Sequence, residues 1–220
     1  MNCYAKDYCK GWGKPNCNEL CNLYVKLNAI YTQSYIPTRY RYEIPLRPQS
    51  HDKENFLLLK DYKDNIVTHV ENGDNLYIYS QETGNGKSCW STKIANHYIR
   101  KIVTKSLIED EVKYMNVSEF LESIKDNFTN HDTTFLEYKE SLKGCKLLIV
   151  DDIGAERPTD WVRETLYNII NTRYMDMKAT IFTSNCSPDM LIEQLGKRIG
   201  SRVLSGKIVE LKGFDRRLDK

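Results

Sequence analysis

The feature that most constrains the fold is an apolar run at residues 76–80 that leads, through a glycine-containing loop, straight into a helical pattern at residues 88–101. Short apolar runs of the same kind recur at residues 112–117, 147–151, 179–184 and 207–211. Helical patterns lie between these runs, and such alternation is typical of a parallel sheet with crossover helices. The sequence therefore predicts an α/β fold in which a five-stranded parallel sheet is flanked by helices.

The helical segments between the later strands have recognisable boundaries. Ser118 is suited to cap a helix that begins at Glu119, because its hydroxyl can accept a hydrogen bond from a backbone N–H in the first turn. An amphipathic helix is predicted over residues 160–174, and residues 191–203 are predicted to be helical in at least two pieces.

The loop after the first strand reads Gly84-Asn85-Gly86-Lys87-Ser88 and runs into a helix. Glycines let backbone N–H groups turn toward a polyphosphate, lysine supplies a positive charge, and the serine hydroxyl can bind Mg²⁺ at the helix N-terminus. The usual pattern starts with glycine where this chain has Gln81, which takes a positive φ less readily. The placement between strand and helix still favours a nucleotide site over a chance match.

A second motif is the apolar run at residues 147–150 followed by Asp151 and Asp152. Carboxylates at the end of a buried strand are costly without a cation, and a Mg²⁺ shared with Ser88 would supply one. We expect Asp151 to act through metal-bound water and Asp152 to orient or deprotonate the attacking water. The alternative is a loop with two solvated aspartates.

Two further groups of side chains extend the predicted site. Asn185 follows the strand at residues 179–184 and, in this sheet, would lie near the γ-phosphate and hold the water, although an Asn after a strand is often a turn residue. Arg198 and Arg202 are four residues apart and share a helix face. They form either a solvated basic surface or an arginine presented to the nucleotide of a neighbouring subunit.

Several motifs together resemble one known family. They are Asp151-Asp152-Ile153-Gly154-Ala155-Glu156-Arg157, Trp161-Val162-Arg163-Glu164, Asn171-Thr172-Arg173-Tyr174, Thr183-Ser184-Asn185 and Arg198-Ile199-Gly200-Ser201-Arg202. The similarity covers roughly residues 36–217 and begins with Ile36-Pro37-Thr38-Arg39-Tyr40. In these motifs the chain resembles the bacterial DnaC/DnaI-type helicase loaders, an AAA+ branch that also includes the IstB-like transposon ATPases.

The resemblance implies a P-loop AAA+ ATPase that binds ATP and Mg²⁺ at a site between subunits, hydrolyses ATP weakly and delivers a ring helicase to single-stranded DNA. Carried over by motif, the ATP and Mg²⁺ residues are Lys87, Ser88, Asp151 and Asp152. Asn185 would be sensor I, Arg202 the first choice for the arginine finger with Arg198 second, and Arg216 or Arg217 sensor II. The helical lid domain of many AAA+ proteins is not expected here.

Four of the seven cysteines fall in the first 21 residues, at Cys3, Cys9, Cys17 and Cys21. Four thiolates suit tetrahedral zinc, and a segment this short cannot build an adequate core alone, so the favoured interpretation is a zinc module with four cysteine ligands. An iron–sulfur cluster and plain structural thiols are the alternatives. DnaI-like loaders carry an N-terminal metal-binding module that contacts the helicase, and by position the same docking role is implied here.

The charge and composition of the chain set the remaining expectations. Residues 1–48 hold seven Lys or Arg against three Asp or Glu, together with seven tyrosines, whereas the whole chain carries only +2. We expect a Cys-rich module at residues 1–35, a linker at 36–50 and the AAA+ domain at 51–220. No apolar run is long enough for a membrane span and no signal peptide is evident, which predicts a protein of the bacterial cytoplasm without membrane contact.

The predicted function is therefore ATP-dependent loading of a replicative helicase, with the helicase, single-stranded DNA and further copies of the chain as partners. The compact size and the cysteine module suggest a phage-encoded version. Two alternatives remain open, namely an IstB-like transposition helper and an adaptor that binds ATP without hydrolysing it.

Overall fold

The computed structural model describes residues 3–42, 45–48, 52–105, 111–130, 133–155 and 159–215, with residues 125–130 as backbone only. Its centre is a sheet of five strands in the order β2-β3-β4-β1-β5, and every pairing is parallel. The strands are β1 (Leu76–Tyr79), β2 (Val112–Asn116), β3 (Leu147–Asp151), β4 (Ala179–Ser184) and β5 (Lys207–Glu210). The predicted α/β class and the five-stranded parallel sheet are confirmed.

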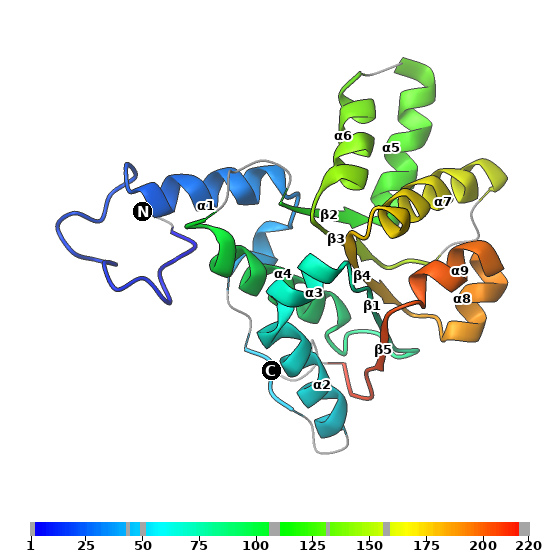
Figure 1. The fold of residues 1–220 in the computed structure, drawn as a ribbon, viewed down its shortest axis with the longest axis horizontal. Coiled ribbons are helices and arrows are strands. Elements are labelled where there is room, and N and C mark those ends of the chain that lie inside the picture. The colour runs from blue at the N-terminus through cyan, green and yellow to red at the C-terminus, as the bar shows by residue number, and fades with distance from the viewer. Residues whose placement is uncertain are drawn as a thin grey trace.

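Alternate residues of the strands contribute to two separate cores, one on each face of the sheet. Figure 1 shows the helices that lie on the two sides of the sheet. In β1, for example, Leu76 and Ile78 belong to one core and Tyr77 to the other. The first face is covered by α1 (Asn22–Gln33), α2 (Lys53–Asp64), α3 (Ile66–Asn72) and α4 (Lys87–Ile102). The second face is covered by α5 (Val117–Asn130), α6 (Thr133–Gly144), α7 (Asp160–Met175), α8 (Pro188–Leu195) and α9 (Lys197–Val203).

The start of α5 and the break between α8 and α9 test two predicted helix boundaries. Helix α5 begins at Val117, and the side-chain oxygen of Asn116 accepts a hydrogen bond from the Glu119 N–H at 3.1 Å. The prediction that Ser118 caps this helix is therefore wrong, because Asn116 already occupies the capping position one residue before the helix. The prediction of two helical pieces near residues 191–203 is confirmed, since Gly196 separates α8 from α9 with φ +86°.

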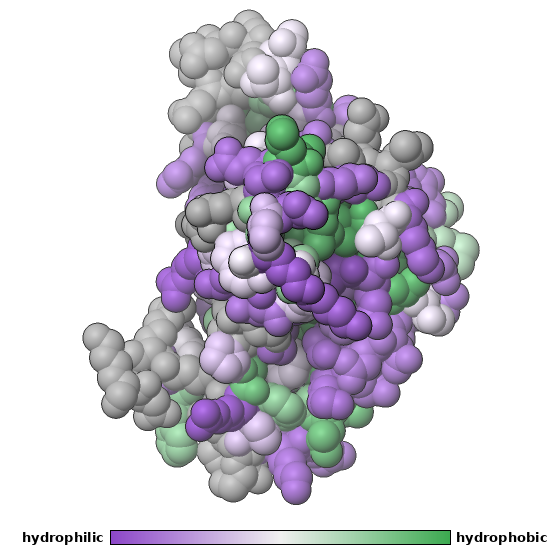
Figure 2. All heavy atoms as spheres, turned by 90° about the vertical axis from the view of Figure 1, so that its left-hand side faces the viewer, coloured by the Kyte–Doolittle hydropathy of each residue, from purple (hydrophilic) through white to green (hydrophobic). Residues whose placement is uncertain are grey.

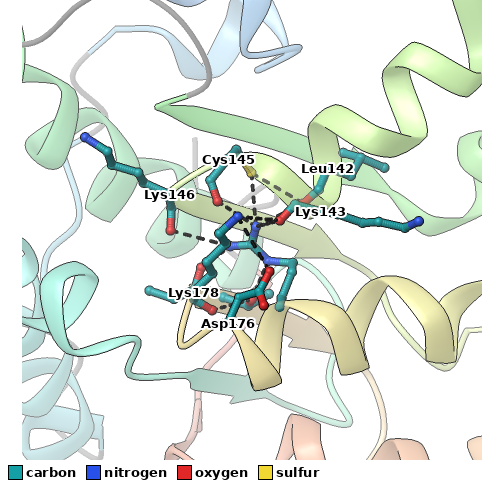
Figure 3. A network of polar contacts seen from close by, with 9 residues as sticks. Leu142, Lys143, Cys145, Lys146, Asp176 and Lys178 are labelled. Atoms are coloured by element: carbon teal, nitrogen blue, oxygen red, sulfur yellow. Dashed lines mark hydrogen bonds and ion pairs between the residues drawn. The ribbon is translucent and has the colours of Figure 1, made fainter.

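A buried arginine of α7 forms hydrogen bonds with the N-terminal ends of two strands. The Arg173 side chain is 1% exposed. Its guanidinium donates to backbone carbonyls of Leu142 (2.9 Å), Cys145 (2.7 Å) and Ala179 (2.6 Å), and its Nε donates to the Thr180 hydroxyl (3.0 Å). Figure 3 shows the labelled residues of the α6–β3 connection close to Asp176 and Lys178, which follow α7. The starts of β3 and β4 are therefore held together from the end of α7.

The N-terminal segment packs into the same core as the sheet. Leu27, Ile30 and Tyr31 on one face of α1 are buried there, and the Tyr31 hydroxyl donates to Asn96 of α4 at 3.1 Å. The carbonyl of Ser34 accepts from a backbone N–H of the edge strand β2 at 2.7 Å. The division into module, linker and ATPase domain stays a prediction, but the described parts of the first two share packing with the third. Within the described residues, no helix is both long and apolar enough to cross a bilayer.

Candidate nucleotide-binding site

A cleft of about 1190 Å³ opens at the carboxyl ends of the strands. Its walls come from the loop before α4, from the ends of β2, β3 and β4, and from the segment after α1. The lining residues are Arg39, Tyr40, Pro45, Leu46, Arg47, Pro48, Thr83, Gly84, Asn85, Gly86, Lys87, Ser88, Cys89, Tyr114, Asn116, Asp151, Asp152, Thr183 and Asn185. The structure thus brings the predicted loop, both aspartates and Asn185 into one cavity. Parallel strands make this possible, because their carboxyl ends meet at one edge.

The loop before α4 has the backbone that phosphate binding requires. Gly84 and Gly86 have φ of +72° and +106°, in the left-handed region that glycine enters at little cost. Gln81 is not among the residues with positive φ, so the expected strain at the missing glycine is not found. The chain makes the turn instead at the two glycines that it does have.

Two side chains stabilise this loop from within. Asn85 is buried and its amide donates to the Ser80 hydroxyl and, at 3.3 Å, to the Leu211 carbonyl just after β5. The Lys87 ammonium donates to the carbonyls of Ser80 (3.3 Å) and Glu82 (2.9 Å). A cation at the N-terminus of a 16-residue helix is well placed to bind an anion.

The carboxylate of Asp151 is surrounded by hydroxyl donors. Ser88 and Tyr114 both donate to its Oδ2, at 3.0 and 2.7 Å, and Thr183 donates to its Oδ1 at 2.6 Å. Asp151 itself is 5% exposed. Ser88 and Asp151, which were predicted to share a Mg²⁺, therefore lie in direct contact.

Asp152 lies beside this group in an unusual backbone conformation. Its φ of +62° is left-handed, and its N–H donates to the Thr183 hydroxyl at 3.0 Å. The Asn185 amide donates to its carboxylate at 3.0 Å. Burial raises the pKa of Asp152 above its usual range, the nearby Asp151 charge adds to this, and Lys87 opposes it. A half-buried carboxylate with a raised pKa at the mouth of a polar cleft is suited to accept a proton from water.

Arg198 and Arg202 lie outside the lining of this cleft. Their guanidinium groups stack on the ring of Tyr167 at 4.6 and 5.1 Å, and Arg202 also donates to the Asn171 side chain at 2.8 Å. This places both arginines on the outer surface of α7 and α9, away from the nucleotide site of their own chain. Arg216 and Arg217 lie outside the described residues.

The four N-terminal cysteines do not form a ligand set. Cys3 is buried in the core and Cys9, Cys17 and Cys21 are half-buried, with none in a disulfide. Across the described ranges, which include all four, there is no group of three or more His, Cys, Asp or Glu side chains that could hold a metal. The predicted zinc is therefore not supported, and the buried α1 residues supply the packing that a metal was expected to replace.

Sequence reasoning missed three contributors to the site. Tyr114 was predicted only as a strand residue, and Thr183 belonged to a predicted motif in which only Asn185 had a role. Residues 39–48 were predicted as linker, although the family resemblance includes Arg39 and Tyr40. The alternation within β2 and β4 indicates which residues share a face but not which of them reach a neighbouring strand's last residue. The aromatic and basic residues Arg39, Tyr40 and Arg47 were a signal that this segment has contacts to make.

Comparison with known proteins agrees with this geometry. The family model for the bacterial DnaA ATPase domain matches residues 64–210, more than half of the chain. The replicative helicase loader DnaI of Bacillus subtilis is 33% identical over 143 residues, covering 64% of this chain and 43% of DnaI. The replicative helicase loader DnaC of Escherichia coli is 24% identical over 131 residues, covering 59% of this chain and 50% of DnaC. The chain thus spans about half, or less, of the length of these relatives.

Solved structures show the same fold. A crystal structure of DnaI superposes with a TM-score of 0.65 at 21% identity, covering 81% of this chain and 96% of that chain. A structure of the replication initiator DnaA bound to AMPPCP and single-stranded DNA superposes with a TM-score of 0.61 at 20% identity, covering 82% of this chain and 52% of that chain. These likenesses show that the chain shares its fold with DnaI and DnaA.

Proposed function

Because the chain belongs to the family of bacterial DnaA ATPase domains, we propose that it binds ATP and Mg²⁺ and loads a replicative ring helicase onto single-stranded DNA. The observation that carries the proposal is the contact between Ser88 of the phosphate loop and Asp151 at the end of β3, at 3.0 Å. The sequence likeness to DnaI and DnaC supports the loading role.

Each part of the cleft has a role in this proposal. The backbone of residues 84–88 and the Lys87 ammonium bind the triphosphate, and Tyr40 and Leu46 form a wall for the base. ATP would supply the anhydride bond that is hydrolysed, and Mg²⁺ would supply positive charge next to the phosphates. Asp152 and Asn185 orient a water molecule, and the raised pKa of Asp152 favours proton acceptance.

A second copy of the chain is proposed to complete the catalytic site. Arg198 and Arg202 lie outside the cleft of their own chain, so hydrolysis by a single copy is expected to be slow. An arginine supplied by a neighbour is typically worth about 10³-fold or more in rate.

We expect Arg202→Ala to lower ATP turnover at least ~100-fold, because the neighbour's charge is lost, while ATP binding stays within twofold. Arg198→Ala is the parallel variant for the second choice. Mixing Arg202→Ala with Lys87→Ala, which keeps its arginines, should restore part of the turnover, as measured by phosphate release. A mixture as inactive as its components would argue against action between copies.

The helicase is proposed to dock on the N-terminal side of the molecule. Leu20 is 88% exposed and Trp12 is 39% exposed there, although both are apolar. Figure 2 looks onto this side and shows hydrophobic residues interrupting a largely hydrophilic surface. Exposed aromatic and aliphatic side chains of this kind are frequent anchors of protein interfaces.

The double variant Trp12→Ser and Leu20→Ser should weaken helicase binding at least ~10-fold, since anchor residues typically contribute about 2 kcal/mol or more. The measurement is capture of the helicase by the full immobilised chain, with and without ATP. The full chain is required because removing residues 1–35 would also remove buried core residues of α1. Leu57→Ser, on the exposed side of α2, is the matched control.

Helicase capture and ATP turnover together distinguish the alternatives. If the Trp12 and Leu20 double variant captured as much helicase as Leu57→Ser, the helicase would not dock on this surface. ATP turnover that responds to duplex DNA, without helicase binding, would favour an IstB-like helper. ATP binding without turnover in the presence of helicase and single-stranded DNA would favour a non-hydrolysing adaptor.

A further inference from the structure

Tyr114 makes a contact that no motif accounts for. It lies in the edge strand β2, paired in register with Ile149 of β3, and its hydroxyl reaches Oδ2 of Asp151, the last residue of β3, at 2.7 Å. The residue is 6% exposed, and it also lines the cleft. One tyrosine thus spans the distance from the core to the nucleotide site.

The position of this ring is set by the backbone around it. The Tyr114 N–H donates to the Ser34 carbonyl at 2.7 Å, at the end of α1. The Tyr138 hydroxyl of α6 lies 3.5 Å from the Tyr114 carbonyl. Both contacts involve the backbone of Tyr114, so they hold the strand segment that carries the ring at the edge of the sheet.

The hydroxyl is a permanent donor in this arrangement. Burial, together with the adjacent Asp151 charge, raises the pKa of Tyr114 well above its usual range. The proton therefore stays on the phenol at any physiological pH. The bond to Asp151 is a charge-assisted one, which is typically the stronger kind.

Counting acceptor positions shows what this bond does. A carboxylate offers about four lone-pair positions on its two oxygens. Ser88 and Tyr114 occupy those of Oδ2, and Thr183 occupies one on Oδ1. Among the described residues these are the hydroxyl donors to Asp151, so the second position on Oδ1 is left to accept a hydrogen bond from a water molecule in the cleft.

We propose that Tyr114 is a positioning residue of the nucleotide site, whose hydroxyl fixes the Asp151 carboxylate so that its one remaining acceptor position serves the water shell of Mg²⁺. This inference rests on the proposed function, because it assumes that ATP with magnesium is the ligand. Ser88 and Asp151 belong to the recognised motifs, and Tyr114 adds a donor from a strand outside them.

Tyr114→Phe tests the proposal, because it removes a single oxygen from the site. Loss of a group that orients a metal-binding residue typically weakens metal affinity about 10-fold or more. We expect the Mg²⁺ concentration needed for half-maximal binding of a non-hydrolysable ATP analogue to rise about 10-fold in titration calorimetry. Affinity for the same analogue in EDTA should stay within twofold, because the phosphate loop is untouched.

Tyr98→Phe is the matched control. Its hydroxyl likewise donates to a buried carboxylate, that of Glu111, at 3.3 Å, but it lies away from the nucleotide cleft. Both variants should lose similar stability in thermal unfolding, and only Tyr114→Phe should change the magnesium dependence. Should Tyr114→Phe not fold, 3-fluorotyrosine at position 114, which keeps the ring and makes the hydroxyl a stronger donor, should shift Mg²⁺ affinity more than twofold, and at position 98 it should not.

The outcomes distinguish a failure of this inference from a failure of the proposed function. An unchanged magnesium dependence in Tyr114→Phe, with ATP analogue bound as tightly as by the unaltered chain, overturns the role of Tyr114 and leaves the proposed function intact. An unaltered chain that binds no ATP analogue in either condition overturns the proposed function itself. If Tyr98→Phe raised the Mg²⁺ concentration needed for half-maximal binding as much as Tyr114→Phe does, the role of Tyr114 would also be rejected, because the effect would then reflect general stability.

Discussion

Replacing Lys87 with alanine is expected to lower the affinity for ATP at least ~100-fold, since losing one member of a buried charge pair costs about 3 kcal/mol or more. The ammonium lies among loop carbonyls, at 2.9 Å from that of Glu82, and no other described lysine lines the cleft. The phosphate would therefore lose the cation that the phosphate loop itself supplies. Fluorescence titration with a labelled ATP analogue measures the effect.

The comparison variant is Lys101→Ala, because Lys101 is exposed in the last turn of the same helix α4. It should bind ATP within twofold of the unaltered chain, and both variants should unfold at similar temperatures. Affinity of Lys87→Ala within threefold of the unaltered chain would mean that the loop is not the phosphate site.

Arg173→Met is expected to destabilise the fold by about 4 kcal/mol, since buried carbonyls that lose a charged donor remain unpaired. The guanidinium satisfies acceptors on the connection before β3 and at the start of β4, including the Cys145 carbonyl at 2.7 Å. Methionine fills similar volume but donates nothing. The unfolding temperature should fall by about 10 °C for a chain of this size, and urea unfolding gives the free energy.

Arg163→Met is the control on the same helix, where the arginine is partly exposed and its ion pair with Asp160 is at the surface. Its loss should cost less than ~1 kcal/mol. Arg173→Lys should recover only part of the stability, because a single ammonium cannot reach the same spread of carbonyls. A loss below ~1 kcal/mol in Arg173→Met would show that water replaces the lost donor.

The elements that the sequence predicted well are those with local signals. The apolar runs of the strands, the glycines before Lys87 and the paired aspartates each depend on neighbours in the chain. Once the strands pair in parallel, their carboxyl ends lie at one edge of the sheet, and no further sequence signal is needed to predict this. The phosphate loop and Asp151 could be placed for this reason.

The parts that were missed depend on contacts between distant residues. The Tyr114 hydroxyl meets Asp151 across 37 positions of sequence, and no local pattern marks such a pair. In the N-terminal segment a local signal was present, because Leu27, Ile30 and Tyr31 have the spacing of one helix face. The four cysteines led to the prediction of a metal site, whereas these three apolar residues pack the segment against the core of the sheet.

The burial of α1 against strands formed much later in the chain has a consequence for biosynthesis. Leu27 and Ile30 share a core with Ile181 and Val209, so α1 cannot complete its packing until the strands that carry these later residues have been synthesised. Domains of this kind fold as units. The surface that displays Trp12 and Leu20 thus takes its final shape only after β4 and β5 have been synthesised and packed against α1.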